Sequence, residues 1–273
     1  MTGRYSSSRA ASRGFSLIEL MVALVAGLIV SYAVVAFTMS SMKSNAEYVQ
    51  STKLTQSLRN TLDIVMRDLR RAGYDDNAIG RLSGGVASLA VGNSPFSPLL
   101  LDNSDATNGS CVIYAYDRPS AIAADAGKLN PDQGEVRGLR RRQVTPSNTG
   151  KQVGVIEYAV SAGTAKPTCG AASADYTTFP AQCNGMWCPL TDASTINIST
   201  FAIAETSATV IGTDPGAIRI RNFSLALDGR LVGDDGTSYL NGVSSSYKRG
   251  LAATIRVRSD CVNTTIVNCN SSP

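Results

Sequence analysis

The 273-residue chain contains no histidine, and only 17% of its residues are charged. The absence of histidine excludes the usual general base at neutral pH and most zinc sites. The chain also has no C-x-x-C pair, no glycine-rich phosphate loop and no G-x-S-x-G elbow. We therefore expect a protein that is not an enzyme and that carries no catalytic residue, metal site or cofactor.

The net charge is small as well. The formal charge of +4 includes Arg4, Arg9 and Arg13, which lie close together near the N-terminus. The charge that remains without them is too low to indicate a nucleic-acid-binding surface.

Charged side chains are missing altogether from Leu20 to Met42. With a rise of about 1.5 Å per residue, a helix of this length covers roughly 34 Å, and the hydrocarbon core of a bilayer is about 30 Å thick. The sequence therefore predicts one membrane span, which we assign to residues 15–42.

The polar stretch before this span, residues 1–14, differs from an ordinary secretory leader, in which the cleavage site follows the apolar region. Here the predicted cleavage site, between Gly14 and Phe15, precedes the apolar region. Cleavage there removes the basic leader and leaves the whole span in the mature chain. The leader's positive charge favours a cytoplasmic N-terminus and a C-terminal part on the other side of the membrane.

Glu19 is the exception within this apolar stretch, because a carboxylate near the start of a membrane helix is costly without a partner. One interpretation places Glu19 at the membrane interface, where the positive end of the helix dipole favours an anion. The other pairs Glu19 with the amine that cleavage frees at Phe15, within one chain or between neighbouring subunits.

The run GFSLIEL from Gly14 to Leu20 resembles the prepilin signal of type IV pilins and of type II secretion pseudopilins. The resemblance implies cleavage after Gly14 by the prepilin peptidase, N-methylation of Phe15, and a role for Glu19 in recruiting subunits or setting their register.

A second helical segment follows the span, since residues 43–72 contain neither proline nor glycine. Apolar residues recur there at steps of three and four, at Leu54, Leu58, Leu62, Val65, Leu69 and Ala72. This stripe favours packing against a core over a coiled-coil seam, because a β-rich region that needs cover comes next. We expect one helix from about Phe15 to Ala72, ended by Gly73.

From Asp75 onward, short apolar runs alternate with Gly, Pro, Asn, Asp and Ser, which is typical of antiparallel strands joined by loops. The predicted strands are Gly85 to Val91, Cys111 to Asp117, Val136 to Gln143, Gln152 to Val160, Ile196 to Ala204, Ala217 to Asp228 and Leu251 to Ser259. The predicted fold is α+β, with a long N-terminal helix packed on an antiparallel sheet. Its parts are the leader 1–14, the span 15–42, the amphipathic helix 43–73 and a globular domain 74–273.

Two further stretches extend the resemblance. The run RDLRRAGY from Arg67 to Tyr74 is similar to a motif of PilW-type minor pilins, and the runs 223–231 and 251–259 look like the paired final strands of PilW-type or J-type domains. That family often ends the last strand with Arg-Asn, whereas Arg258 is followed here by Ser259.

Six cysteines lie in the part predicted to be outside the cytoplasm: Cys111, Cys169, Cys183, Cys188, Cys261 and Cys269. An even number in an oxidising compartment indicates disulfides. Proximity along the chain favours Cys261 with Cys269, and Cys183 with either Cys188 or Cys169. The connectivity stays open, because six cysteines allow fifteen pairings.

Two polar runs allow other interpretations. Residues 102–109, DNSDATNG, carry oxygen ligands that suit calcium but lack the EF-hand spacing, so we predict a polar surface loop. Arg140, Arg141 and Arg142 are compatible with DNA binding, but alternation along a strand splits them between two faces. A solvated edge strand is the favoured interpretation.

The resemblance implies a structural minor pilin of a type IV pilus that primes assembly near the tip and serves adhesion and twitching motility. Its implied partners are other minor pilins, the major pilin, the prepilin peptidase, the inner-membrane assembly platform and a tip adhesin. The implied location is the inner membrane and then the pilus. The alternatives are a J-type pseudopilin of a type II secretion system, and a membrane-anchored module that binds DNA or another ligand.

Overall fold

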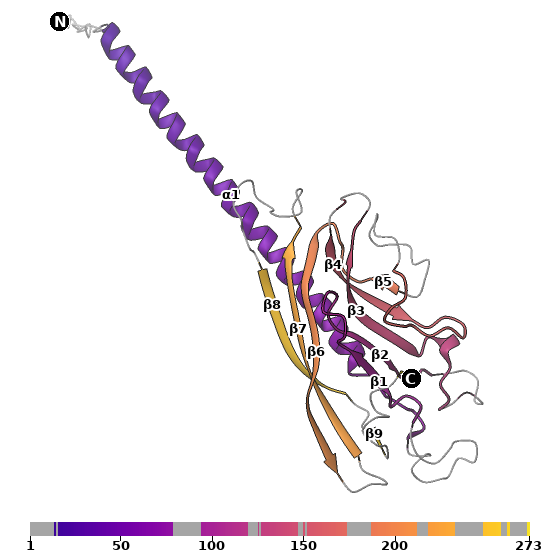
Figure 1. Ribbon diagram of the computed structural model, residues 1–273. Helices are drawn as coiled ribbons and strands as arrows, with labels where there is room; N and C mark the ends of the chain where they lie inside the picture. The colour runs from indigo at the N-terminus through magenta and orange to yellow at the C-terminus, as the bar shows by residue number, and fades with distance from the viewer. Residues whose placement is uncertain are drawn as a thin grey trace, which may run out of the picture. The chain divides into compact units, whose positions relative to one another are not determined.

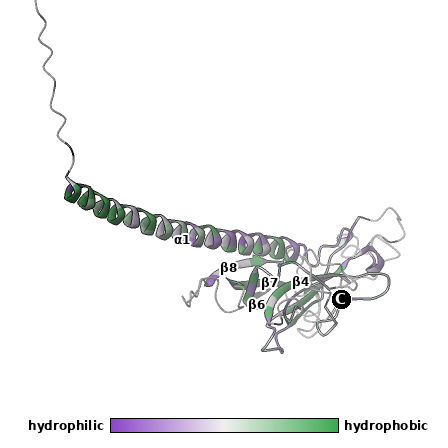
Figure 2. Ribbon diagram, turned by 90° about the horizontal axis from the view of Figure 1, so that it is seen from above, coloured by the Kyte–Doolittle hydropathy of each residue, from purple (hydrophilic) through white to green (hydrophobic). Residues whose placement is uncertain are grey.

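The computed structural model describes residues 14, 16–78, 94–119, 125, 127–146, 150, 152–173, 187–211, 218–232, 248–257, 261–262 and 272–273. The chain divides into two units, Met1–Gln50 and Ser51–Pro273. Helix α1, Leu17–Leu69, contributes to both. The first unit contains the apolar part of the helix, which Figure 2 colours as hydrophobic, and the second contains the rest of the helix and all the strands.

Helix α1 ends close to the predicted position. After Leu69 the backbone tightens, because the amides of Arg71 and Ala72 donate to carbonyls three residues earlier, Asp68 and Leu69. Gly73 then takes a φ of 76°, which a residue with a side chain rarely adopts, and its amide donates to the carbonyl of Ala115 over 2.7 Å. The predicted start at Phe15 lies outside the described residues.

Two antiparallel sheets form the body of the second unit, where one sheet was predicted (Figure 1). The first sheet has the order β1-β2-β3-β4-β5, with strands Leu99–Asp102, Cys111–Ala115, Val136–Val144, Val153–Val160 and Trp187–Pro189. A short 3-10 helix, η2, Pro131–Gln133, precedes β3. The second sheet has β6, β7 and β8 in order, Ile196–Ile211, Ile218–Leu231 and Lys248–Arg256, and β9, Cys261–Val262, also pairs with β7.

The main core lies between α1 and both sheets. The predicted stripe from Leu54 to Ala72 is buried, and it packs with residues such as Val112, Ile156, Phe201 and Leu225 from four strands. At about 25 cal/mol per Å² of buried apolar area, each such side chain contributes roughly 1.5–3 kcal/mol to folding. The preference for core packing over a coiled-coil seam is therefore confirmed.

A second apolar cluster covers the other face of the first sheet. It contains Phe96, Ile113, Val136, Ala159 and the fully buried Trp187. Gly138 leaves room for the indole, since a Cβ at this position would lie 2.7 Å from a ring carbon of Trp187. This cluster holds the segment around Cys169 and Ala171 against the sheet.

Most of the predicted strands are present. β2, β3, β4, β6, β7 and β8 match predicted runs, and β7 pairs with β8 as expected, with Leu225 opposite Ala253. β1, β5 and β9 were not predicted, and β6 continues to Ile211, past the predicted end at Ala204. The run Gly85 to Val91 lies outside the described residues, as does Ser259.

Candidate functional site

The residues of the predicted processing signal lie at the start of α1. Gly14 is exposed, and a Cβ added there would meet nothing within 4 Å. The carbonyl of Ser16 accepts hydrogen bonds from the amides of Glu19 and Leu20, over 3.0 and 3.1 Å, and so begins the helix. Glu19 is exposed in the first turn. Phe15 is not among the described residues.

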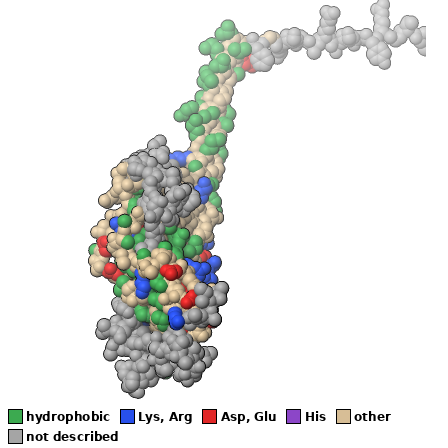
Figure 3. Space-filling model, turned by 90° about the vertical axis from the view of Figure 1, so that its right-hand side faces the viewer, with side chains coloured by type: hydrophobic (Ala, Val, Ile, Leu, Met, Phe, Trp, Pro, Cys, Tyr) green, Lys and Arg blue, Asp and Glu red, His purple; other side chains and the backbone are tan. Residues whose placement is uncertain are grey.

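The apolar part of α1 has no protein cover in the structure. The helix is long and apolar enough to cross a membrane, and its most hydrophobic 18-residue window, with a mean hydropathy of 2.6, is 0% buried. Large side chains such as Leu17, Tyr32 and Phe37 are more than three-quarters exposed. Figure 3 shows this hydrophobic surface along the helix. In this exposure the helix differs from the core helix of a soluble domain, which is mostly buried.

The end of the helix is fixed by Asp68, which belongs to the RDLRRAGY run. Its carboxylate accepts hydrogen bonds from the hydroxyls of Tyr114 and Tyr116, and it lies 3.6 Å from the Arg137 guanidinium. Arg137 also stacks on the Tyr116 ring at 4.9 Å. Burial, followed by the Asp68 charge, raises the pKa of Tyr114 well above its ordinary value. The motif therefore docks the helix onto β2 and β3.

The arginine run on β3 contradicts the predicted solvated edge strand. β3 pairs with β2 on one side and β4 on the other, and only 2% of Arg140 and 6% of Arg141 is exposed. The alternation was right, but both faces of this strand are covered. Arg140 and Arg141 therefore cannot contribute to a DNA-binding surface, because their guanidinium groups are buried and hydrogen-bonded within the protein.

Arg140 holds the Cys169 segment against the sheet. Its Nε lies 2.5 Å from the Glu157 carboxylate, and its Nη1 donates to the carbonyls of Cys169 and Ala171. The guanidinium also stacks on Trp187 at 4.0 Å. Burial lowers the pKa of Arg140, and the neighbouring Glu157 opposes this shift. Sequence reasoning missed Glu157, although a single acid in the apolar run VGVIEYAV is a signal for a buried partner.

Arg141 points to the opposite face and connects the two sheets. Its Nε donates to the carbonyl of Ile198 on β6 over 2.7 Å, and its Nη1 donates to the carbonyls of Thr107 and Asn108. Gly154 makes room for this guanidinium, since a Cβ there would lie 2.7 Å from it. Arg142 is partly exposed and donates to the carbonyl of Ala171.

The disulfide that the structure describes joins Cys111 on β2 to Cys169. The suggested pairing of Cys169 with Cys183 is therefore wrong, because residues 58 apart in sequence are brought together by the sheet. Cys188 is also disulfide-bonded. Cys183 and Cys269 lie outside the described residues, and the side chain of Cys261 is not described.

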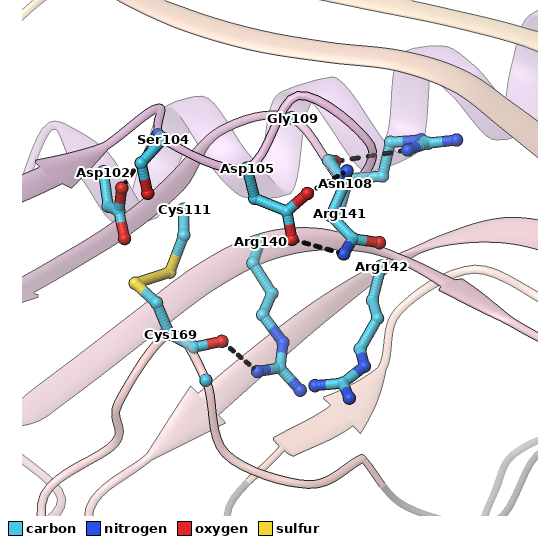
Figure 4. Close-up of a pocket in the computed structure, with 11 residues that line it drawn as sticks. Asp102, Ser104, Asp105, Asn108, Gly109, Cys111, Arg140, Arg141, Arg142 and Cys169 are labelled. Carbon is cyan, nitrogen blue, oxygen red and sulfur yellow. Dashed lines mark hydrogen bonds between the residues drawn. A yellow bond between two sulfur atoms is a disulfide. The ribbon is translucent and has the colours of Figure 1, made fainter.

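A surface pocket lies between this disulfide and the loop 103–109 (Figure 4). Hydrogen bonds to two carboxylates stabilise the loop. Asp102 accepts a hydrogen bond from the amide of Ser104, and Asp105 accepts hydrogen bonds from the amide and the side chain of Asn108. Hydrogen bonds from Ser104 and from Asn108 lower the pKa of Asp102 and Asp105, respectively. In the described part of the chain, no three His, Cys, Asp or Glu residues are grouped to hold a metal ion.

Three acids gather where the chain leaves the helix. Asp117 accepts a hydrogen bond from the amide of Asp76 over 3.1 Å, and Asp75 accepts from the hydroxyl of Ser94 over 2.5 Å. Burial raises the pKa of Asp117, and the charges of Asp75 and Asp76 raise it further.

We expect Asp117→Asn to flatten the pH dependence of stability. A group whose pKa is raised by folding contributes fully below its unfolded pKa, near 3.9, and loses this contribution as the pH rises through its folded pKa. Asp117 should therefore add stability to the wild-type chain as the pH falls through its folded pKa toward about 3.9, and the variant should lack this gain. Urea unfolding of the detergent-solubilised chain measures this. Asp132→Asn, at an exposed acid, is the control, and an unchanged slope in Asp117→Asn contradicts the prediction.

Comparison with known proteins agrees with the geometry. The family model described as the prokaryotic N-terminal methylation motif matches residues 9–35, which include Gly14, Phe15 and Glu19. The family model described as prepilin peptidase-dependent protein B matches residues 47–249, well over half of the chain. No curated protein and no solved structure matches.

These matches confirm the resemblance to minor pilins of the type IV pilin-like class, although neither match names the PilW type. They also fit the exposed apolar helix of a membrane-anchored pilin or pseudopilin. Such proteins are structural components, not enzymes. The chain belongs to the family of prepilin peptidase-dependent protein B.

Proposed function

We propose that this chain is a minor pilin of a type IV pilus that primes assembly and lies near the pilus tip. The observation that carries the proposal is the apolar part of α1, which is uncharged from Leu20 to Met42, has no protein cover, and follows directly after the processing signal at Gly14 and Phe15. In this proposal residues 1–14 are removed, Phe15 is N-methylated, and residues 15–42 remain in the inner membrane. The part from residue 74 onward lies in the periplasm.

Polymerisation follows from the cost of exposing this helix. Its side chains are stable in lipid, and leaving lipid is unfavourable unless the helices of neighbouring subunits replace the lipid contacts. The subunit is therefore held by a membrane or by a polymer. Its partners in the proposal are other minor pilins, the major pilin, the prepilin peptidase, the assembly platform and a tip adhesin.

Mass spectrometry of the mature N-terminus tests the processing step. A chain that begins with methylated Phe15 supports the proposal. A mature chain that begins at Met1, or that lacks the apolar helix, refutes it.

Glu19→Ala is expected to lower recovery of the subunit in sheared surface fibres by at least about tenfold, since removing one partner of a buried ion pair leaves the other charge uncompensated and costs several kcal/mol. The reason is that Glu19 pairs with the freed amine of Phe15 in the assembly. Immunoblots of sheared fibres and of membranes measure the distribution. Asp63→Ala is the matched control, because Asp63 is an exposed acid on the same helix outside the apolar segment. Recovery of Glu19→Ala in sheared fibres at the wild-type level would contradict the proposed role of this carboxylate.

A deletion strain distinguishes a pilus from a secretion pseudopilus. Deletion of the chain should abolish twitching or adhesion while secretion of exoproteins continues. The reverse result assigns the chain to a type II secretion system.

A further inference from the structure

The two sheets have four edges, and three of them carry a feature that prevents pairing with another chain. β1 is four residues long, and β5 is three residues long and ends in Pro189. β8 carries Lys248, Arg249 and Arg256, all exposed. Short strands, proline and charge are the usual ways in which proteins protect a sheet edge.

The fourth edge, along β6, is covered over its first part only. Arg141 donates to the carbonyl of Ile198, and the amide of Ser110 donates to the carbonyl of Phe201 over 3.1 Å. The amide of Ile203 donates to the hydroxyl of Ser110, and its carbonyl accepts from the side chain of Asn103. The loop 103–110 therefore occupies the edge as far as Ile203.

Beyond Glu205 no described strand or loop pairs with this edge of β6, and we call residues 206–211, TSATVI, the arm edge. The amide of Val257 donates a hydrogen bond to the carbonyl of Arg221. The backbone amide and carbonyl of Arg221 therefore point toward the β8 side of β7 and away from β6. Ala208 is opposite Arg221 and Val210 is opposite Arg219, and by alternation both direct their amide and carbonyl outward. No described residue forms a hydrogen bond with these outward groups.

The side chains of the arm edge are apolar or small, and none is charged. Val210 is 56% exposed and Ile211 is 53% exposed. Because neighbouring residues of a strand point to opposite faces, β6 is exposed on both faces at Val210 and Ile211. The arm edge also contains no proline or glycine, and four of its six residues are exposed and β-branched, a type of side chain that strands favour.

We propose that the arm edge binds an extended, uncharged strand of a different subunit, which adds to the sheet beside Ala208 and Val210. The occupant is a strand because the open groups are backbone amides and carbonyls at strand spacing, and it is uncharged because the exposed side chains beside them are apolar. The identity of the occupant as another subunit rests on the proposed function.

A photo-crosslinking amino acid at Ile211 tests this site in the full chain, in cells that assemble the fibre. Val210→Pro removes the outward amide without removing a bond to β7, whereas Val210→Ala keeps the amide. We expect crosslinks from the Val210→Ala chain to an uncharged, extended segment of another processed subunit, and at least a tenfold loss in Val210→Pro. Val210→Lys, which places a charge on the edge and keeps the backbone, should show the same loss.

Each other outcome overturns the proposal: no crosslink, an equal crosslink in Val210→Pro and Val210→Lys, a crosslink to a second copy of this chain, or one within the same chain. Trp187 fluorescence checks that the variants are folded. Processing at Phe15 and recovery in fibres are scored in the same cells. A chain that enters fibres without the crosslink refutes only the arm edge, whereas a chain that never enters fibres refutes the proposed function.

Discussion

Arg140→Ala is expected to destabilise the globular part of the chain by about 3–5 kcal/mol. The substitution leaves the Glu157 carboxylate, which is 0% exposed, without its cation. It also removes the donor to the carbonyls of Cys169 and Ala171 and the cation stacked on Trp187. Urea unfolding followed by Trp187 fluorescence measures the loss directly, because Trp187 is the chain's one tryptophan and lies against Arg140.

Two further variants separate the buried charge from the general loss of an arginine. Arg142→Ala, two residues along the same face, removes one hydrogen bond from a partly exposed residue and should cost under about 1.5 kcal/mol. Arg140→Met combined with Glu157→Leu removes both charges and should recover most of the stability. If Arg140→Ala and Arg142→Ala cost the same, the buried pair is not the cause.

The helix and most strands could be predicted because each follows from a local pattern. The stripe from Leu54 to Ala72 has helical spacing, and the runs that form β7 and β8 alternate as strands do. The short strands β1 and β5 could not be predicted in this way. Trp187–Pro189 contains too few residues for a pattern, and its pairing with β4 depends on the fold around it.

The arginine run shows where local patterns stop being informative. Alternation correctly places Arg140 and Arg142 on one face of β3 and Arg141 on the other. Exposure, however, depends on what the distant chain places over each face: the Cys169 segment on one side and β6 on the other. The same is true of the disulfide, since Cys111 and Cys169 are 58 residues apart in sequence and lie together because Cys169 packs against the first sheet. The processing signal, by contrast, is one contiguous motif from Gly14 to Leu20, so it could be predicted from the sequence alone.

Arg141 has a different role from Arg140, because it faces carbonyls and no carboxylate. The carbonyl of Ile198 that it binds belongs to a fully buried residue, whereas the carbonyls of Thr107 and Asn108 lie in an exposed loop. Burial lowers the pKa of Arg141, with the Asp105 charge opposing this shift. The guanidinium therefore joins β3, β6 and the loop 103–110 at one point.

Arg141→Met is expected to cost about 2–4 kcal/mol, since a buried acceptor left without its donor costs about 1–3 kcal/mol and the loop loses two further bonds. The loss should be local as well as global: hydrogen exchange should accelerate first at Ile203 and Gln143, whose amides donate to Ser110 and Asn108 of the loop. Arg219→Met is the matched control, because its ion pair with Glu205 is partly exposed and is worth about 1 kcal/mol or less. Equal losses in the two variants, or exchange that accelerates uniformly, would show that Arg141 does not fasten the loop and β6 to the first sheet. The arm edge begins just beyond this fastening, so a chain with a loosened loop should expose the β6 backbone from Ile198 onward and extend the open edge toward the core.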